Sequence, residues 1–401
     1  MRILLVHNFY QSASPSGEDI VFDNEFHLLQ QAGHEVFCYT RHNDDISSSV
    51  TDKVYAAASL FWSRKTHREL TRMIKEHRPD VAHFHNTFPL ISASGYAACK
   101  DHGVPIVQTL HNYRLICPGA LLLRDGKPCE DCIGNSMFPA IQHGCYRHSR
   151  SATALITGML NLNRIRGTYA HMVDRYICLT GKARQRMIRG GLPASKLTVK
   201  ANVLRNPPAA GTGNGGYALY VGRLTTEKGV STLINAWRNI EYPLKIAGDG
   251  ALRATLENAV RQSNTMIEFL GFRPREEILR LMQQAQLLII PSECYEGFPV
   301  TVLEAFATGT PLLVSRIGAL DELIEDSVNG RKFAPGDAAA LQQAALQMLA
   351  DPGALQMMRI ANRLLFEKQY APAQAIVNLE SIYRDVIAQR STIISPFVAL
   401  N

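Results

Sequence analysis

The chain has 401 residues, of which 46% are apolar and 19% are charged, and its formal net charge is +7. This composition excludes a disordered chain, and the length favours two domains because single cores stop growing near about 250–300 residues. No apolar run approaches the roughly 18–20 residues that span a bilayer, and the start, MRILLVHNFY, is too short for a signal peptide and lacks a cleavage site. Together with eight cysteines, these features predict a cytoplasmic protein with reduced thiols.

Strand and helix signals alternate along the first half of the chain. The apolar run Arg2–Val6 predicts a strand buried on both faces, and a polar loop, Asn8–Ser16, leads to Gly17. A helix is predicted at Glu18–Ala32, because acidic residues at its start suit the helix dipole and Gly33 suits its end. Further strands are predicted at Glu35–Thr40, Val81–His85 and Ile106–Leu110.

The second half repeats this alternation more regularly. Strands are predicted at Ala218–Val221, Leu244–Ala247, Ile267–Leu270, Leu287–Ile290 and Pro311–Val314. Apolar residues at helical spacing predict helices at Val230–Trp237, Leu252–Arg261, Glu276–Gln284 and Val300–Ala307. Such βα alternation implies parallel sheets covered by helices on both faces.

The predicted fold class is therefore α/β, with two doubly wound, Rossmann-like domains at 1–205 and 216–370. The Pro- and Gly-rich stretch Asn206–Gly216 is the linker between them. A final helix at 371–390 is predicted to pack back on the first domain. Because ligands of such sheets bind at the carboxyl ends of the strands, the two domains should face a common cleft that holds the chemistry.

Several common motifs are absent or misplaced. Gly211–Gly216 matches G-x-G-x-x-G but precedes a strand instead of joining a strand to a helix, so it is interpreted as linker. The sequence has no P-loop, no G-x-S-x-G elbow and no Asp-x-Asp pair. Kinase-type phosphate binding and the simplest metal–diphosphate clamp are thereby disfavoured.

A cationic turn follows the strand predicted at Ala218–Val221. The sequence from Gly222 to Gly229 reads GRLTTEKG and leads into a helix, with Arg223 and Lys228 on the turn. A guanidinium and an ammonium beside unpaired helix N–H groups can neutralise a diphosphate without a metal. Two solvated surface cations are the alternative interpretation.

Two glutamates flank the next helix start. Glu296 precedes a helix predicted to begin near Phe298, and Glu304 lies eight residues further, about 80° around the axis. Both carboxylates could accept hydrogen bonds from vicinal sugar or ribose hydroxyls, and the amides of Gly297 and Phe298 could hold an anion. Acidic residues that only offset the helix dipole are the alternative.

Taken together, Gly222-Arg223, Glu227-Lys228-Gly229 and the pair Glu296 and Glu304 resemble the retaining family-4 glycosyltransferases, which have the GT-B fold. The similarity continues through IAGDG at 246–250, FLG at 269–271 and GTP at 309–311, and it covers nearly all of residues 1–390. The first-domain features are looser: Gly17 in a loop after the first strand, with Ser16 and Glu18 beside it where two glycines are commoner, and His111 after a strand.

The resemblance implies a role for each matched residue. Arg223 and Lys228 would bind the donor diphosphate together with the loop at Gly222, and Glu304 would hold the ribose. Glu296 would bind hydroxyls of the transferred sugar, with backbone N–H groups from Gly297 and Phe298. Gly17 would let its loop approach the donor phosphates, and His111 would lie near the reacting sugar.

The implied activity is sugar transfer from a nucleotide-diphosphate sugar to a lipid-linked or surface-polysaccharide acceptor. It would proceed with retention of configuration and without a metal cofactor, because local cations stabilise the departing diphosphate. Two alternatives stay open. One is a nucleotide-sugar 2-epimerase of the same fold, and the other is a non-catalytic sugar-nucleotide-binding or zinc scaffold protein.

Four cysteines cluster in an insert at 117–145, with the pattern C-x11-C-x2-C-x12-C. Cys117, Cys129, Cys132 and Cys145 could hold a structural zinc as four thiolates. Reduced thiols and disulfides are the alternatives, and the predicted compartment disfavours disulfides.

The net positive charge arises in the first half of the chain. Residues 1–200 contain 24 basic and 16 acidic residues, and eleven of the basic residues lie in 147–200 with a single acid, Asp174. The members that dominate this segment are Arg147, Arg150, Arg164, Arg166, Arg184, Arg186 and Arg189. Such a segment is typical of a solvated helix face, or of attraction to an anionic membrane surface or lipid diphosphate; no nucleic-acid-binding motif accompanies it. A peripheral position on the inner face of the membrane is compatible with this pattern.

Overall fold

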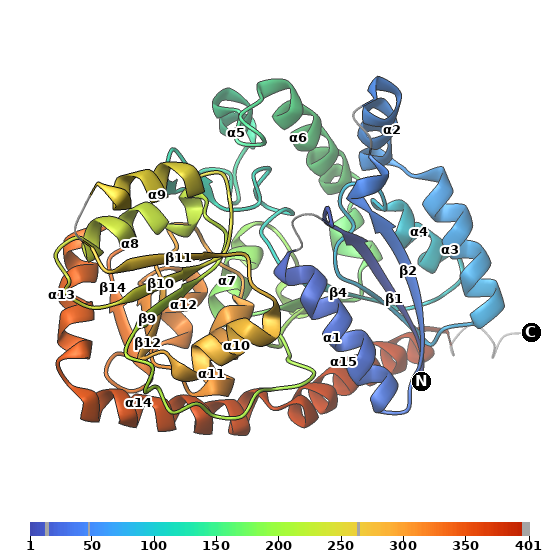
Figure 1. The fold of residues 1–401 in the computed structure, drawn as a ribbon. Coiled ribbons are helices and arrows are strands. Elements are labelled where there is room, and N and C mark those ends of the chain that lie inside the picture. Colours follow the sequence, from blue (N-terminus) through green and yellow to red (C-terminus); the bar gives the residue numbers. More distant parts are fainter. Residues whose placement is uncertain (13–15, 47–48, 263–264, 395–401) are drawn as a thin grey trace, which may run out of the picture. The chain divides into compact units, whose positions relative to one another are not determined.

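A computed structural model describes residues 1–12, 16–46, 49–262 and 265–394. The chain divides into two compact units (Figure 1). The first unit comprises Met1–Ala120, Asp131–Arg205 and the chain from Pro372 onward. The second comprises Leu121–Glu130 and Asn206–Ala371.

The first unit is built on a six-stranded sheet in which all strands are parallel. Its strand order is β2-β1-β3-β4-β7-β8, so the order reverses at the neighbouring strands β1 and β3. The strand bounds are β1 (Arg2–Phe9), β2 (Glu35–His42), β3 (Val81–Phe84), β4 (Ile106–Leu110), β7 (Arg175–Cys178) and β8 (Leu197–Val199).

Helices cover both faces of this sheet. On one face, buried residues such as Ile3, Val81 and Val107 pack against α1 (Gly17–Gln31) and α15 (Pro372–Ile394). On the other face, Phe84 packs edge-on against Tyr96, with ring centroids 4.9 Å apart. The remaining helices of this unit are α2 (Val50–Phe61), α3 (Arg64–His77), α4 (Ser94–Asp101), α5 (Phe138–His143), α6 (Arg150–Ile165) and α7 (Gly181–Arg189). Short helical turns lie at 43–45, 168–172 and 194–196.

The second unit also has a six-stranded parallel sheet. Its order, β11-β10-β9-β12-β13-β14, reverses between β9 and β12. This is the doubly wound order of dinucleotide-binding domains. The strand bounds are β9 (Ala218–Val221), β10 (Leu244–Ala247), β11 (Ile267–Gly271), β12 (Leu287–Ile290), β13 (Leu312–Ser315) and β14 (Gly330–Phe333).

The core of the second unit lies between this sheet and flanking helices. Trp237, the largest fully buried side chain, packs with strand residues such as Leu244 and Ile289. The helices are α8 (Val230–Trp237), α9 (Arg253–Arg261), α10 (Arg275–Gln284), α11 (Val300–Thr308), α12 (Gly318–Leu323), α13 (Ala338–Leu349) and α14 (Pro352–Leu365). Helical turns lie at 226–228 and 366–370, and the hairpin β5–β6 (Leu123–Arg124, Lys127–Pro128) belongs to this unit.

The predicted α/β class with two doubly wound parallel sheets is confirmed. Some details differ from expectation. The first strand continues to Phe9, so the loop expected from Asn8 begins at Tyr10, and its residues 13–15 lie outside the described residues. Part of the cysteine-containing insert, Leu121–Glu130, groups with the second unit. Among the described residues, no helix is both long and apolar enough to cross a membrane.

Candidate functional site

The site in the second unit lies where its strand order reverses. β9 and β12 are hydrogen-bonded neighbours, with Leu219 opposite Leu288 and Tyr220 opposite Ile289. The loops that follow these strands, 222–229 and 291–299, therefore leave the sheet side by side. This crevice at the carboxyl ends of the strands is where open α/β sheets bind ligands.

Glycine allows the two loops to approach closely. Gly229 has a φ of +67°, and a Cβ added there would lie 1.9 Å from the carbonyl oxygen of Pro291. The amide of Glu293 donates to the carbonyl of Glu227 across the same gap at 2.9 Å. Only a residue without a side chain meets both demands, because an L residue is strained at this φ and its Cβ would overlap a backbone oxygen.

Lys228 and Glu296 form an ion pair across this crevice. The Nζ of Lys228 lies 2.6 Å from Oε1 of Glu296, and Ser292 Oγ donates to the same oxygen at 2.7 Å. Burial tends to raise the pKa of Glu296, but the Lys228 ammonium and the two hydrogen bonds outweigh it and lower that pKa. Burial tends to lower the pKa of Lys228, but Glu296 raises it. Each partner thus holds the other in its charged form.

Arg223 differs from Lys228 in being exposed. Its side chain is 56% exposed and lies 3.3 Å from Glu227, while its backbone carbonyl accepts a hydrogen bond from Tyr220 Oη at 2.8 Å. The loop holds the backbone of Arg223 in place but leaves the guanidinium able to reorient toward an anion. Gly222 joins this loop to the sheet, since its amide donates to Ala247.

Glu304 is buried in α11, and its carboxylate pairs with a residue that the sequence did not indicate. Arg275, the first residue of α10, places Nε 3.1 Å from Glu304 Oε1. Burial raises the pKa of Glu304 to about 7, against the opposing effect of Arg275. This carboxyl therefore changes charge near neutral pH.

The helix start after β12 corrects one prediction. α11 begins at Val300, as predicted for the helix Val300–Ala307, and its N-cap is Pro299, so the start near Phe298 that was inferred from Pro299 is wrong. Glu296 is therefore in the loop and not on the helix, so the 80° separation from Glu304 does not describe the two carboxylates. Gly297 also lies in this loop, where its amide has no backbone acceptor among the described residues.

In the first unit, His111 directly follows β4 and is half-buried. Its Nε2 lies 3.0 Å from Nδ1 of His85, which follows the neighbouring strand β3. Gly17 is the first residue of α1, whose N-cap Ser16 forms a reciprocal capping box with Asp19. Glu18, the next residue, accepts a hydrogen bond from Asn112 at 2.8 Å, which ties the start of α1 to the segment after β4.

None of the eight cysteines, all of them among the described residues, forms a disulfide. Within the insert, Cys117 and Cys132 are buried, while Cys129 and Cys145 are partly exposed. A Cβ on Gly119 would lie 3.6 Å from the Cβ of Cys145, which places Cys145 beside the segment that begins at Cys117.

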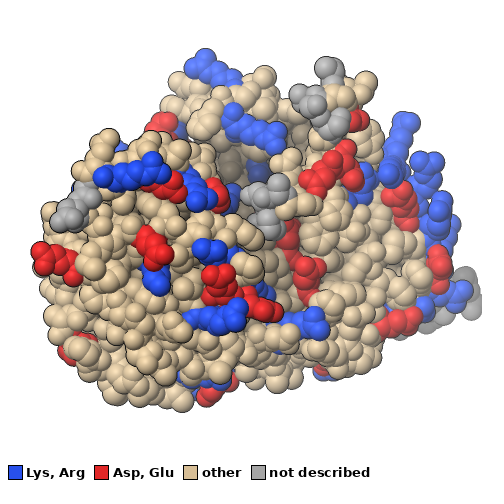
Figure 2. All heavy atoms as spheres, in the orientation of Figure 1, with Lys and Arg blue, Asp and Glu red and all other residues tan. Residues whose placement is uncertain are grey.

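Several of the cationic side chains in residues 147–200 donate hydrogen bonds to backbone carbonyls of the first unit. Arg164 donates to the carbonyl of Leu115, Arg184 to that of Leu197 and Lys196 to that of Val173, at 2.7–3.3 Å. The exposed cations of the segment are Arg147, Arg150, Arg166 and Arg189. Figure 2 shows basic side chains near the top, where α5 and α6 lie in Figure 1, and basic and acidic groups mixed over the rest of this face.

Family models match both units. The model "Glycosyltransferase Family 4" matches residues 21–203, and "Glycosyl transferases group 1" matches residues 209–364. These two matches cover most of the chain, so it belongs to the glycosyltransferases of these groups, and its paired parallel-sheet units have the GT-B fold. The predicted family is thereby confirmed.

Individual relatives agree with this assignment. A glycogen synthase of Mycobacterium tuberculosis is 31% identical over an alignment of 300 residues, which covers 71% of this chain and 64% of the relative. The chain thus spans less than two thirds of that relative's length. The O-antigen chain mannosyltransferase B of Escherichia coli is 32% identical over 147 residues, 34% of this chain and 37% of that protein.

A solved structure extends the likeness of the fold. The Anabaena protein Alr3699/HepE in complex with UDP superposes with a TM-score of 0.65 at 17% identity, covering 96% of this chain and 100% of the other.

Proposed function

We propose that this glycosyltransferase moves a sugar from a nucleotide-diphosphate sugar to a lipid-linked or surface-polysaccharide acceptor, with retention of configuration. The observation that carries the proposal is the Lys228–Glu296 ion pair at the point of strand reversal in the second sheet. It keeps a cation and a carboxylate fixed 2.6 Å apart at the carboxyl ends of β9 and β12. A diphosphate needs the cation, and sugar hydroxyls need the carboxylate.

The proposed chemistry follows from where charge develops. Breaking the anomeric C–O bond leaves negative charge on the diphosphate and positive charge on the sugar. An ammonium has three N–H donors, so Lys228 can keep Glu296 and still bind a phosphate oxygen. Arg223 can turn its exposed guanidinium to the same group. Lys228 is already held in place by Glu296, and a positive group that needs no rearrangement contributes most to such stabilisation.

The remaining residues take supporting roles in this proposal. Glu304 accepts hydrogen bonds from the ribose, and Gly297 and Phe298 offer backbone N–H groups to the sugar. Gly17 and Gly222 let backbone approach the donor phosphates, and His111 meets the transferred sugar. The acceptor hydroxyl attacks from the leaving-group face, and the departing phosphate takes its proton, so no protein nucleophile is needed. Activity that survives exhaustive chelation would agree with metal-independent transfer.

A screen of nucleotide-sugars by thermal shift tests donor binding, since a ligand at 100 times its Kd stabilises the folded state by about 2.7 kcal/mol. Product analysis with donor alone and with acceptor then separates the alternatives. Epimerised donor without acceptor supports the 2-epimerase, and binding without turnover supports the non-catalytic scaffold. NMR of the new glycosidic bond reports retention or inversion.

Replacing Glu296 by Gln should abolish transfer while the protein remains folded. Glu268→Gln is a matched control, because Glu268 is exposed on the edge strand β11. Full activity in Glu296→Gln would contradict the assigned role.

We also propose that the acceptor is presented at a membrane surface, where the protein binds peripherally on the cytoplasmic face. Phe138 on α5 is 65% exposed, and Arg147 and Arg150 are exposed near the start of α6. Exposed cations each add about 1 kcal/mol of attraction to anionic lipid. Co-sedimentation should be stronger with anionic than with neutral vesicles and should weaken with salt; equal binding to both would refute this part.

For the insert, we propose a structural zinc held by Cys117, Cys129, Cys132 and Cys145. Four sulfur ligands suit tetrahedral zinc, and such a site stabilises folding outright. Elemental analysis of protein purified without chelator should give one zinc per chain, and the quadruple serine variant should contain none. A ratio near zero in the unaltered protein would contradict the site.

A further inference from the structure

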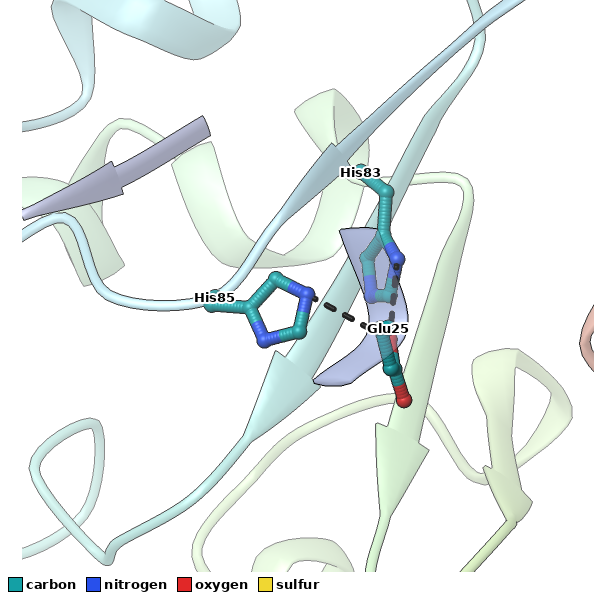
Figure 3. A group of neighbouring side chains, drawn as sticks. All are labelled: Glu25, His83 and His85. Atoms are coloured by element: carbon teal, nitrogen blue, oxygen red, sulfur yellow. Dashed lines mark ion pairs between the residues drawn. The ribbon is translucent and has the colours of Figure 1, made fainter. Parts of the chain in front are cut away.

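A second cluster of titratable groups lies inside the first unit, behind His111. Glu25 on α1, His83 on β3 and His85 just after β3 place one ligand atom each within 4.8 Å of one another, and all three are buried (Figure 3). His83 and His85 are two residues apart, so both point to the sheet face that α1 covers. The motif His83-x-His85 is visible in the sequence, but its partner Glu25 is nearly 60 residues away.

A metal is not the best occupant of this cluster. The Lys200 ammonium lies 2.6 Å from Glu25 Oε1, so a divalent cation at the same carboxylate would face a fixed positive charge. Both ring nitrogens of His83 are already engaged, Nδ1 with Tyr383 Oη at 2.7 Å and Nε2 with Thr109 Oγ1 at 2.8 Å. His83 therefore has no lone pair to offer unless this arrangement breaks.

The arrangement instead determines which ring nitrogen carries a proton along the series Glu25, His85 and His111. Glu25 Oε2 forms an ion pair with His85 Nε2 at 3.4 Å, and neither atom makes a hydrogen bond in the described part of the chain. The carboxylate favours a proton on this nitrogen, because a lone pair there would face a buried, negatively charged oxygen. Burial opposes ionisation of Glu25, but Lys200 and then His85 and His83 hold its pKa well below the usual range.

The state of His85 then dictates that of His111. Burial lowers the pKa of His85, so its ring carries one proton, on Nε2, and its Nδ1 is an acceptor. Nε2 of His111, 3.0 Å away, must therefore donate to it. Burial, followed by the positive charge of His85 when protonated, lowers the pKa of His111 well below its usual value. His111 is thus neutral, and its Nδ1 bears a lone pair without a partner among the described residues.

We propose that Glu25 and His85 are positioning residues that hold His111 as the Nε2-protonated tautomer, so that Nδ1 accepts a hydrogen bond from a hydroxyl of the sugar substrate. We call Glu25, His85 and His111 the relay. Its role in binding the sugar rests on the proposed function, whereas the tautomer that it sets follows from the geometry alone. A neutral ring also suits the reaction, because an imidazolium would repel the positive charge that develops on the transferred sugar.

Two substitutions of His85 separate the parts of this relay. The side-chain oxygen of Asn is attached at Cγ, as Nδ1 is in histidine, so His85→Asn keeps an acceptor for His111. The polar atoms of Gln lie one carbon further out, near the place of Nε2, so His85→Gln keeps a partner for Glu25 and loses the acceptor. The other charged or titratable groups around the pair, His7, His83, Lys200 and Tyr383, are unchanged in both variants.

The first readout is independent of catalysis. Nitrogen-15 NMR of histidine-labelled protein, assigned by loss of the signals in His111→Asn, should show His111 protonated at Nε2 in the unaltered protein and in His85→Asn. In His85→Gln that tautomer should no longer dominate. His111 protonated at Nδ1 in the unaltered protein, or unchanged in His85→Gln, would overturn the relay even where sugar transfer is observed.

The second readout is kinetic and uses the donor identified by the screen. His85→Gln should lower kcat on the order of 10- to 100-fold with the KM for donor little changed, the size of effect found when partners that orient metal-bound histidines are removed. His85→Asn should restore most of kcat. Equal kcat losses in two equally stable variants would show that the acceptor for His111 does not matter. Failure of the unaltered protein to transfer any sugar would instead count against the proposed function, and the NMR result would still stand.

Elemental analysis tests the competing occupant. Metal that is retained in a folded quadruple Cys→Ser variant and lost when His83→Gln is added to that variant would overturn the relay in favour of a metal site at Glu25, His83 and His85. Absence of metal from a quadruple variant that is still folded, as judged by its urea unfolding transition, supports the relay.

Discussion

Replacing Glu304 by Gln should remove a pH dependence from the stability of the second unit. Burial raises the pKa of Glu304 from 4.5 to about 7 in the folded protein, and the unfolded chain has the lower value. The folded state therefore binds the proton more tightly. The contribution of protonated Glu304 to the free energy of unfolding is fully present below pH 4.5, declines as pH rises and is lost above pH 7.

The magnitude follows from the size of this shift. One pKa unit is worth 1.36 kcal/mol, so the unaltered protein should lose about 3 kcal/mol between about pH 4.5 and 7.5 relative to Glu304→Gln. The carboxyl is 5% exposed, so solvent screening reduces this value little. Loss of the ion pair with Arg275 adds an offset, but Arg275 keeps its charge throughout, so only the slope with pH reports on Glu304.

Trp237 provides a probe confined to the second unit. The chain has two tryptophans, and Trp237 is fully buried in the core of this unit, so a Trp62→Phe background leaves one reporter. Urea unfolding followed by its fluorescence, at half-unit steps from pH 4.5 to 8, gives the free energy of unfolding for each variant. Glu268→Gln controls for loss of one exposed carboxylate. A pH-independent difference between the unaltered protein and Glu304→Gln would refute the reasoning.

Three further outcomes are expected in the second unit. Arg223→Ala should weaken nucleoside-diphosphate binding at least about tenfold by calorimetry. It should change the free energy of unfolding by no more than about 1 kcal/mol, because the ion pair of Arg223 is exposed. A loss of stability that accompanies the loss of binding would contradict a guanidinium that is free to reorient. Lys228→Met should lower both the affinity for the nucleoside diphosphate and the free energy of unfolding, the latter by on the order of 3 kcal/mol, since Glu296 is left buried without its cation. An unchanged free energy of unfolding would show that the pair is not coupled. Gly229→Ala should destabilise the unit by more than Gly216→Ala, because both have a φ near +70° but only the first Cβ would meet a backbone oxygen, at 1.9 Å; equal urea midpoints would exclude a steric cause.

The sequence predicted the regular elements of the second unit closely. β9, β10, β12 and α8 have the predicted bounds, because short apolar strands between amphipathic helices give two distinct periodicities. β14, which reads GRKF, was not predicted, since two of its four residues are polar and it is an edge strand. α11 begins at Val300, as the apolar spacing of Val300–Ala307 predicted, but the start near Phe298 inferred from Pro299 was too early because Pro299 is the N-cap and not the first helical residue.

Partners of the candidate site residues were harder to predict than the residues themselves. Glu296 and Lys228 stand out because each lies in a loop directly after a strand. Arg275 and His85 do not, because their contacts depend on which strands are neighbours, and strand order is not written in local periodicity. Net charge misled in the same way: the cation count of residues 147–200 cannot distinguish Arg164, which donates to a backbone carbonyl, from an arginine that faces solvent.

The return of the chain to the first unit has a consequence for how the protein is made. Leu379, Tyr383 and Val386 of α15 complete the core under the first sheet, and Tyr383 also contacts His83. Since synthesis runs from the N-terminus, Asn206–Ala371 emerges from the ribosome before this helix does. The second unit can therefore fold before α15 has been synthesised. Until then, the apolar core residues of the first unit that α15 covers stay exposed, unless a chaperone binds them. A fragment ending at Arg205 should be aggregation-prone for the same reason, whereas addition of the α15 peptide should rescue it.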